Sequence, residues 1–296
     1  MDVTAREQAG PSLLRDMVML TKPRIISLLL VTTVAPMFVA GNPTWLLVVV
    51  VLIGGYLMAG GANAVNMYLD SDIDTQMSRT RLRPIPSGRM GPRSVLAFGI
   101  ALATAATFLL ARFTNVLTAL LALGGFYFYV FVYTRWLKRT TPQNIVIGGA
   151  AGAFPPLVGW AAMTGSLDLT ALYLFLIIFY WTPPHFWALA LLKQRDYGRA
   201  GIPMAPLVWG ERQTMMQMLW YNVILIAFTL LPVAFGAFGI IYFISALVLG
   251  LILLAGVIRV LTAKDWTKPA WQVYKFSLLY LALLFLAMVI DRKVLA

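Results

Sequence analysis

The sequence of 296 residues contains no cysteine, a single histidine and little charge. Without cysteine the chain forms no disulfide, no thiolate metal site and no cysteine nucleophile, although this absence does not identify a compartment. Charged residues make up 11% of the chain, against about 25% in soluble globular domains, and 60% of the residues are hydrophobic. A soluble domain is therefore excluded.

The hydrophobic residues fall into blocks of about 20, the length at which a helix crosses the hydrocarbon core of a bilayer. We predict nine such helices, each about 20 to 25 residues long. They are expected to begin near residues 24, 44, 92, 115, 142, 168, 214, 238 and 271. The predicted fold class is all-α, a polytopic membrane protein embedded in the lipid bilayer.

The distribution of positive charge predicts the orientation of these helices. The net charge is +12, which in a soluble protein would suggest a nucleic-acid partner. With a cytoplasmic N-terminus, the cytoplasmic segments 1–24, 70–93, 135–141, 193–213 and 259–275 hold 20 of the 23 basic residues. This bias follows the positive-inside rule, so it predicts a cytoplasmic N-terminus, an external C-terminus and no nucleic-acid partner.

The sequence predicts one domain with two long cytoplasmic loops. Residues 1–23 lack the apolar core of a signal peptide, so we expect a cytoplasmic amphipathic lead-in, followed by a single transmembrane domain over 24–296. The cytoplasmic loops 70–92 and 193–213 are longer than the others, mix aspartate with arginine, and end in proline and glycine. Long loops gathered on one face commonly carry function.

A stripe of polar side chains leads into the first of these loops. Asn66, Asp70 and Asp74 are spaced i, i+4 and i+8, which on a helix places them on one face, with Asp72 on the opposite side. Two carboxylates and an amide oxygen suit Mg²⁺, which takes one or two carboxylates and completes its shell with waters and substrate phosphate oxygens. The spacing therefore predicts a magnesium site.

Three arginines, Arg79, Arg81 and Arg83, follow the stripe at once, and guanidinium groups match the geometry of phosphate. Carboxylates for a metal beside arginines for phosphate predict a site for a diphosphate ester. The alternative is that the arginines only enforce topology and the aspartates neutralise them. Membrane orientation requires positive charge but does not require aspartates spaced four residues apart, so we favour the functional interpretation.

The second loop follows a helix that contains the only histidine. The stretch "PPHFWALALLKQRDYGRAGIPM" places His185 inside the sixth span and Asp196 at its end. Eleven residues make about three helical turns, so we expect both on one face, with His185 deeper in the membrane. An ionisable residue inside a bilayer is costly and usually functional, and the alternative is a structural histidine satisfied by a hydrogen bond.

A third polar stretch, "YTRWLKRTTPQNIVIGGAAG", connects the fourth and fifth spans. Lys138 is either a topology anchor or a diphosphate ligand, and Asn144, just inside the membrane, indicates a cavity. Gly148 and Gly152 form a small-xxx-small face that predicts close helix packing.

These three motifs resemble those of the heme O synthases (protoheme IX farnesyltransferases), which are UbiA-type intramembrane prenyltransferases. The resemblance extends over about residues 15 to 290, and the motifs occur in the expected order. It rests on "NAVNMYLDSDIDTQMSRTRLRP", "YTRWLKRTTPQNIVIGGAAGAFPPLVGW" and "PHFWALALLKQRDYGRAGIPM".

The resemblance implies nine helices around a central cavity, Mg²⁺ as cofactor, and farnesyl diphosphate and heme B as substrates. The implied reaction transfers the farnesyl group to a vinyl group of heme B and gives hydroxyethylfarnesyl heme (heme O) and diphosphate. The implied location is the bacterial inner membrane, with the active-site loops facing the cytoplasm. A downstream heme A synthase is a candidate partner.

The resemblance also assigns roles to particular residues. The candidate catalytic residues are Asp70, Asp74, Lys138, His185 and Asp196. The candidate substrate-binding residues are Asn66, Arg79, Arg83, Tyr133, Asn144, Lys193, Arg195 and Tyr197, and the candidate metal ligands are Asn66, Asp70 and Asp74.

Two motifs differ from those of other family members, the second of them from the quinone-prenylating branch, which has several aspartates there. Tyr133 and Lys138 are one residue further apart than in many relatives, which weakens the assignment of Tyr133. The second motif keeps one acid, Asp196, between basic neighbours that would contact diphosphate or heme propionates directly.

Three other functions are weighed against this one for a polytopic helical protein. A prenyltransferase of the same family could act on another aromatic or tetrapyrrole acceptor. An ion-coupled transporter would place its charges near the bilayer midplane and often shows inverted repeats, whereas the acids here lie at the cytoplasmic boundary among arginines. A structural subunit that binds anionic lipid through basic loops would leave the aspartate stripe unexplained.

Overall fold

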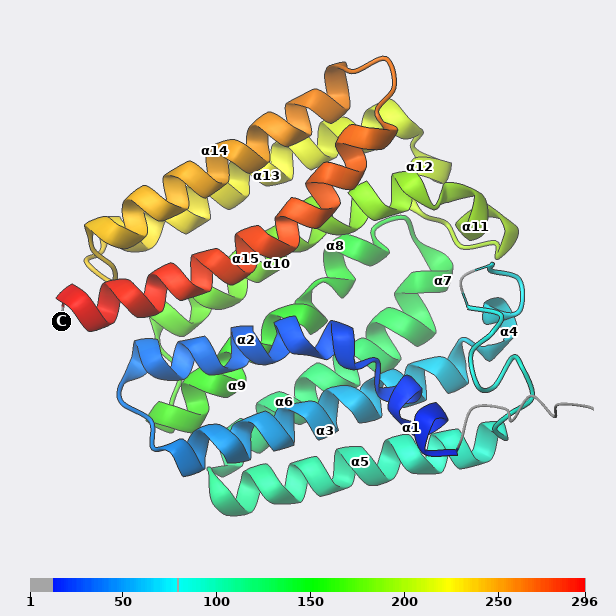
Figure 1. Ribbon diagram of the computed structural model, residues 1–296, viewed down its shortest axis with the longest axis horizontal. Coiled ribbons are helices and arrows are strands. Elements are labelled where there is room, and N and C mark those ends of the chain that lie inside the picture. The colour runs from blue at the N-terminus through cyan, green and yellow to red at the C-terminus, as the bar shows by residue number, and fades with distance from the viewer. Residues whose placement is uncertain (1–12, 79, 296) are drawn as a thin grey trace, which may run out of the picture.

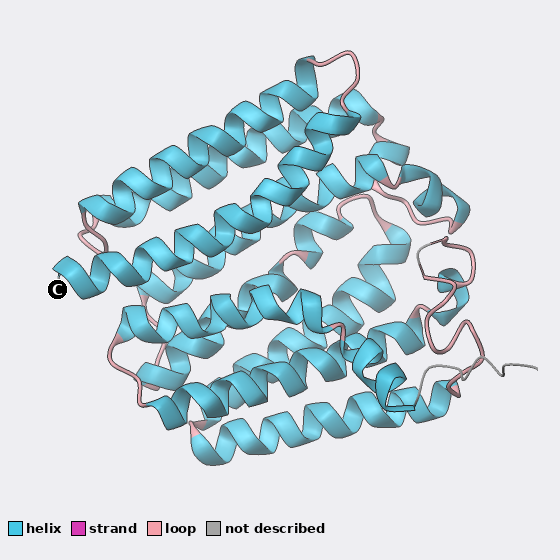
Figure 2. Cartoon of the chain, in the orientation of Figure 1, coloured by secondary structure: helices cyan, strands magenta, loops and turns pink. Residues whose placement is uncertain are grey.

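The computed structural model describes residues 13–78 and 80–295, and this part of the chain contains helices and connecting loops but no strand (Figure 2). The elements are α1 (Leu13–Thr21), α2 (Pro23–Ala40), α3 (Trp45–Leu69), α4 (Ser71–Asp74), α5 (Pro92–Phe113), α6 (Val116–Tyr127), the π-helix η1 (Phe128–Leu137), α7 (Lys138–Thr140), α8 (Asn144–Gly148), α9 (Ala150–Thr164), α10 (Leu169–Leu192), α11 (Gln194–Arg199), α12 (Ala205–Val208), α13 (Glu211–Ala234), α14 (Ile240–Thr262) and α15 (Thr267–Leu295).

Within the described residues, nine helical segments are long and apolar enough to cross a membrane. They are 23–40, 45–69, 92–113, 116–140, 144–164, 169–192, 211–234, 240–262 and 267–294. The all-α fold class and the nine predicted spans are confirmed, and each span begins close to its predicted position. The length and composition of the apolar blocks were sufficient for this prediction, because a span depends on few tertiary contacts.

The long helices run side by side, with α3 and α5 along one edge of the view and α13 and α14 along the other (Figure 1). Between them, α10 is the most enclosed span, since 67% of its membrane window is buried, against 22% for the span 116–140. The largest buried apolar cluster joins α10 to α13, α14 and α15. The helix that carries His185 is therefore central to the bundle.

Three of the turns at one end of the bundle, those before α3, α6 and α10, are closed by side-chain caps. Thr44 accepts from the backbone N–H of Leu47 at the start of α3, and Asn115 and Asp168 do the same for α6 and α10. Such caps satisfy N–H groups that have no partner within the helix. The opposite end carries α1, α4, α11 and α12 together with the long loops (Figure 1).

The orientation of the bundle is still a prediction, and it can be tested directly. Reporters fused after Thr141 and Arg212 should read as cytoplasmic, because these positions follow the fourth span and the second long loop. A reporter at the C-terminus should read as external. A cytoplasmic result at the C-terminus would contradict the predicted orientation.

The structure corrects the prediction of one continuous helix through Asn66, Asp70 and Asp74. α3 ends at Leu69, Asp70 has φ −91° and ψ 4°, and the short helix α4 follows. The register nevertheless persists, because the N–H of Asp70 donates to the carbonyl of Asn66 (2.9 Å) and the N–H of Asp74 to that of Asp70 (2.8 Å).

The prediction that His185 and Asp196 share one helical face is wrong. α10 ends at Leu192, and Lys193, with φ −119° and ψ 16°, separates it from α11, which carries Asp196. The sequence changes here from apolar residues to the polar run "KQRDYGR". The apolar length that crosses the hydrocarbon core ends at this point, and the membrane-spanning helix ends with it.

The predicted glycine face of the fifth span is only half correct. A Cβ at Gly148 would collide with the ring of Tyr133, so this glycine permits a close approach. A Cβ at Gly152 would meet nothing within 4 Å, because this residue borders open space rather than a packed neighbour. The span is also interrupted at Gly149, between α8 and α9.

Candidate active site

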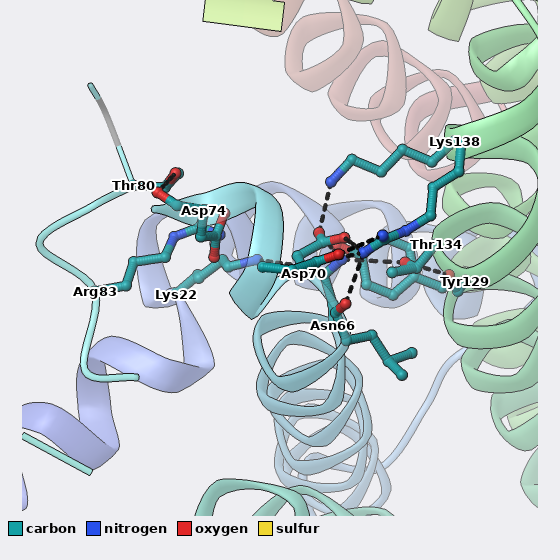
Figure 3. Close-up of polar contacts among 12 residues, drawn as sticks. Lys22, Asn66, Asp70, Asp74, Thr80, Arg83, Tyr129, Thr134 and Lys138 are labelled. Atoms are coloured by element: carbon teal, nitrogen blue, oxygen red, sulfur yellow. Dashed lines mark hydrogen bonds and ion pairs between the residues drawn. The ribbon is translucent and has the colours of Figure 1, made fainter. Parts of the chain in front are cut away.

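The carboxylate of Asp70 is the centre of a polar cluster at the end of α3 (Figure 3). Asp70 is 1% exposed. Its Oδ2 accepts from Lys138 Nζ at 2.5 Å and from Asn66 Nδ2 at 2.8 Å. Its Oδ1 lies 3.8 Å from Arg139 Nη2 and accepts no hydrogen bond from the described residues. A buried carboxylate oxygen without a hydrogen bond is unusual, and it can accept a further cation.

Asp74 is also buried, and it is paired with a different cation. Arg83 Nη1 donates to both carboxylate oxygens, at 2.9 and 2.7 Å. Thr80 Oγ1 donates to the backbone carbonyl of Asp74 at 3.0 Å, which folds the loop after α4 back over this carboxylate (Figure 3). The two acids of the predicted stripe are therefore both buried and both neutralised by basic side chains.

Asp72 behaves differently from its two neighbours. Its side chain is 61% exposed, and Arg139 donates to its two oxygens at 2.7 and 2.8 Å. These hydrogen bonds lower the pKa of Asp72 to about 2, so the pair persists to strongly acidic pH. Asp72 lies on the surface and accepts hydrogen bonds from a different cation than Asp70 and Asp74 do, in keeping with the prediction that it points away from them.

Lys22 is a member of this cluster that the sequence analysis counted only as a topology residue. Its Nζ donates to Asn66 Oδ1 at 3.0 Å (Figure 3). Burial, and next the nearby charge of Arg83, lower the pKa of Lys22 to about 7. Its backbone is left-handed, with φ 56°, the one such non-glycine conformation among the described residues. Backbone strain of this kind is concentrated at functional sites. The only sequence signal was a lysine immediately before the proline that opens the first span.

The π-helix η1 explains the unusual spacing of Tyr133 and Lys138. A π-helix bonds residues i and i+5, and the N–H of Lys138 donates to the carbonyl of Tyr133. Residues five apart therefore lie on successive turns of one face. Thr134 Oγ1 likewise donates to the carbonyl of Tyr129 (2.8 Å) and accepts from Asn66 Nδ2 (3.1 Å). The ring of Tyr133 stacks on that of Tyr129, at 5.7 Å between centroids.

The second long loop meets the first through Asp196. Both carboxylate oxygens of Asp196 lie 2.9 Å from Ser78 Oγ, which joins α11 to the loop after α4. Lys193 Nζ lies 5.7 Å from the centre of the Trp271 ring, and Arg195 is exposed. Tyr197 packs against the main apolar core.

Two further candidates stand apart from this loop contact. Asn144 is fully buried, and its Nδ2 donates to the carbonyl of Thr141 at 2.7 Å and lies 3.5 Å from that of Pro203. Its position therefore ties α8 to the segment before α12. Arg79 lies outside the described residues.

His185 belongs to a separate group of residues. It is 5% exposed, and its Nδ1 lies 2.7 Å from Ser277 Oγ on α15. Its ring stacks on Trp181 at 4.4 Å and on Tyr274 at 4.9 Å between centroids. The candidate residues thus divide into a charged cluster at the end of the bundle and a buried aromatic group between α10 and α15.

The charged cluster has the composition of a magnesium site in which the substrate supplies some of the metal ligands. No group of three or more His, Cys, Asp or Glu side chains positioned for a metal occurs among the described residues. Asp70 and Asp74 supply two carboxylates, and Asp70 Oδ1 has no hydrogen bond. This donor set fits Mg²⁺, which takes few carboxylates and completes its shell with water and phosphate oxygens. Asn66 turns its amide nitrogen towards Asp70 and its oxygen towards Lys22, so it would ligate a metal only after its amide rotates.

Known proteins resemble this chain in both sequence and structure. A sequence model described as the UbiA prenyltransferase family matches residues 28–288. The protoheme IX farnesyltransferase of Roseiflexus castenholzii is 55% identical over 291 residues, which are 98% of this chain and 54% of that protein. The chain thus spans about half the length of the first curated relatives it matches. The protoheme IX farnesyltransferase of Symbiobacterium thermophilum is 51% identical over 97% of this chain and 96% of that protein.

Solved structures share the fold. A digeranylgeranylglyceryl phosphate synthase matches with a TM-score of 0.77 and 18% identity, over 94% of this chain and 98% of that one. A UbiA homolog from Archaeoglobus fulgidus, bound to DMAPP and Mg²⁺, matches with a TM-score of 0.65 and 15% identity, over 91% of this chain and 99% of that one.

Proposed function

The chain belongs to the UbiA prenyltransferase family, and on that premise we propose that it farnesylates heme B at a vinyl group and releases diphosphate, forming heme O. The names of the two farnesyltransferases described above support the acceptor and the donor. The observation that carries the proposal is the pair of buried carboxylates, Asp70 and Asp74, each held by a basic side chain.

These ion pairs suit a site that exchanges partners when substrate binds. Lys138 pairs with Asp70 and Arg83 with Asp74, so each carboxylate is neutralised by a basic side chain. When a prenyl diphosphate enters with Mg²⁺, Asp70 and Asp74 would hold the metal, and the released ammonium and guanidinium groups would contact phosphate oxygens. The homolog solved with DMAPP and Mg²⁺ supports the use of a divalent metal. Mg²⁺ supplies charge that stabilises the departing diphosphate.

The chemistry then requires a dry environment for the electrophile. The bond between farnesyl C1 and the diphosphate oxygen breaks, and the terminal carbon of the heme vinyl group bonds to C1. One water adds as hydroxyl to the cation left on the vinyl group and loses its proton. Buried aromatic residues of α10 and α15, including Trp181, exclude bulk water that would hydrolyse the farnesyl cation first.

The direct test is incubation of membranes containing this protein with heme B, farnesyl diphosphate and Mg²⁺, followed by mass analysis of the extracted hemes. The expected product carries one farnesyl group and one hydroxyl group in addition to heme B. Farnesyl label found on a different aromatic or tetrapyrrole acceptor, with heme B unchanged, would replace the proposed acceptor. Intact farnesyl diphosphate after incubation with purified, folded protein would contradict prenyl transfer.

Lys138→Ala and Arg83→Ala should each raise the KM for farnesyl diphosphate by about 10-fold or more, because each removes a charged contact worth about 1.5–3 kcal/mol. The KM for heme B should change little. The matched control is Arg81→Ala, since Arg81 is exposed in the same loop. A rise confined to the KM for heme would instead assign these residues to the heme propionates.

A further inference from the structure

α10 and α15 hold the ring of His185 on both faces and at one edge. Trp181 and Tyr274 stack against the ring, with interplanar angles of 15° and 22°. Ser277 Oγ lies 2.7 Å from Nδ1, and Trp181 Nε1 donates to the backbone carbonyl of Ser277 at 2.8 Å. The hydroxyl and the carbonyl of Ser277 therefore both contact α10, which fixes this serine against the histidine.

The proton on Ser277 decides the tautomer of the ring. Ser277 Oγ also lies 2.8 Å from the carbonyl oxygen of Tyr274, which has no proton to give, so the hydroxyl donates there. A serine hydroxyl carries only one proton. The contact with the histidine is then a hydrogen bond only if Nδ1 carries a proton and donates it to Oγ. Only the Nδ1–H tautomer of His185 therefore allows both hydrogen bonds, from Nδ1 to Ser277 Oγ and from Ser277 Oγ to the Tyr274 carbonyl.

The remaining nitrogen, Nε2, then carries a lone pair. The ring is 95% buried within a membrane span, and its contacts among the described residues are a hydroxyl and aromatic rings. A charged imidazolium without a carboxylate partner is costly in such surroundings, so the ring is neutral. Nε2 accepts no hydrogen bond from the described part of the chain. Trp181 and Tyr274 stack on the ring and Phe186 lies edge-on to it, at 4.9 Å between centroids, so a ligand would have to reach Nε2 in the plane of the ring.

We propose that Ser277 is a positioning residue that holds His185 as the Nδ1–H tautomer, so that Nε2 offers its lone pair to the iron of the heme acceptor. Histidines that ligate metals generally donate their other ring N–H to a neighbouring acceptor, which fixes both tautomer and orientation. Ser277 supplies that acceptor from a different helix. The identity of the acceptor rests on the proposed function, whereas the tautomer rests on the contacts alone.

The tautomer can be measured without heme, because His185 is the only histidine in the sequence. Untagged protein labelled with ¹⁵N-histidine should show one protonated ring nitrogen, assigned to Nδ1, and one unprotonated ring nitrogen, assigned to Nε2. Ser277→Ala should shift the population towards Nε2–H, and Ser277→Thr should keep the wild-type pattern. Ser245→Ala is the control, since the Ser245 hydroxyl donates only to the carbonyl of Ile241 on α14. An Nε2–H ring in the wild-type protein would overturn the proposal.

The ligation is tested by titrating the purified protein with heme B in the absence of farnesyl diphosphate. The wild-type Soret band should show a nitrogen ligand, and His185→Ala should lose it. Ser277→Ala should weaken heme binding by about 10-fold or more, with Ser277→Thr restoring it. Binding of farnesyl diphosphate should be unaffected in every variant, which shows that the fold is intact.

The two proposals fail in different ways. Heme ligated by His185, without formation of heme O, would refute the proposed function and leave this inference standing. Formation of heme O by a protein whose heme spectrum is the same with and without His185 would refute the inference alone. Equal heme affinity of Ser277→Ala and wild type, despite a shifted tautomer, would remove the positioning role from Ser277.

Discussion

Replacing Asp70 or Asp74 by asparagine should lower the rate of farnesyl transfer by about 10³-fold or more, because several kcal/mol of metal-borne stabilisation would be lost. Asparagine keeps the size of the side chain and removes only the charge that Mg²⁺ requires. Both residues are buried at the end of the bundle and bound by basic side chains. The measurement is turnover of the purified protein over a range of Mg²⁺ concentrations.

Asp72→Asn is the matched control for this experiment. Asp72 lies between the other two aspartates in the sequence, but it is exposed and pairs with Arg139 on the surface. Its loss should leave turnover close to that of the wild-type protein. Near-normal turnover of Asp70→Asn or Asp74→Asn at saturating Mg²⁺ would show that the carboxylates do not hold the metal. Equal loss in all three variants would point to a general effect on the loop.

Replacing His185 by alanine should lower heme farnesylation by about 10²-fold or more, if His185 holds the acceptor in place for reaction. The variant should still bind farnesyl diphosphate with Mg²⁺ at near wild-type affinity. The reason is structural, since the described contacts of His185 are with α10 and α15 and none is with the charged cluster. Calorimetric binding of farnesyl diphosphate and a heme product assay measure the two effects separately.

Added imidazole provides a second measurement on the same variant. If the side chain ligates iron, free imidazole should partly restore the Soret band of heme-loaded His185→Ala protein. A fully active His185→Ala protein with an unchanged heme spectrum would make this residue a structural histidine. The heme assignment would then rest on the similarity to the farnesyltransferases alone.

The apolar spans and the first motif could be predicted from sequence because they depend on local pattern. The spacing of Asn66 and Asp70 was enough to place their side chains in contact, and their hydrogen bond confirms the shared face. The break at Lys193 was marked in the sequence only by the change from apolar to polar residues, which places the end of the span but not the end of the helix. Neither glycine nor proline stands at that position, and the helix ends where the chain leaves the apolar core.

Contacts between distant helices could not be predicted from one sequence. Lys22 reaches Asn66 across 44 residues, and His185 reaches Ser277 across 92. Nothing in the local sequence of Lys22 or Ser277 distinguishes it from an ordinary boundary lysine or helical serine. The π-helix was also not predicted, although the extra residue between Tyr133 and Lys138 was a sequence signal for it.

The division of the site between early and late spans has a consequence for the order in which the protein is assembled. Lys22, Asn66, Asp70, Arg83 and Lys138 all precede the fifth span. A chain that is still being synthesised therefore holds these five residues once its fourth span has entered the membrane, whereas Asp196 follows the sixth span. Ser277 lies in the ninth span, so the histidine receives its partner only when translation is almost finished. The part proposed to bind the donor through Asp70 and its partners can form first, and the part proposed to bind heme is completed last. If both proposals hold, a partly synthesised chain lacks the complete heme site until the ninth span is present and the rest of the bundle can enclose the heme.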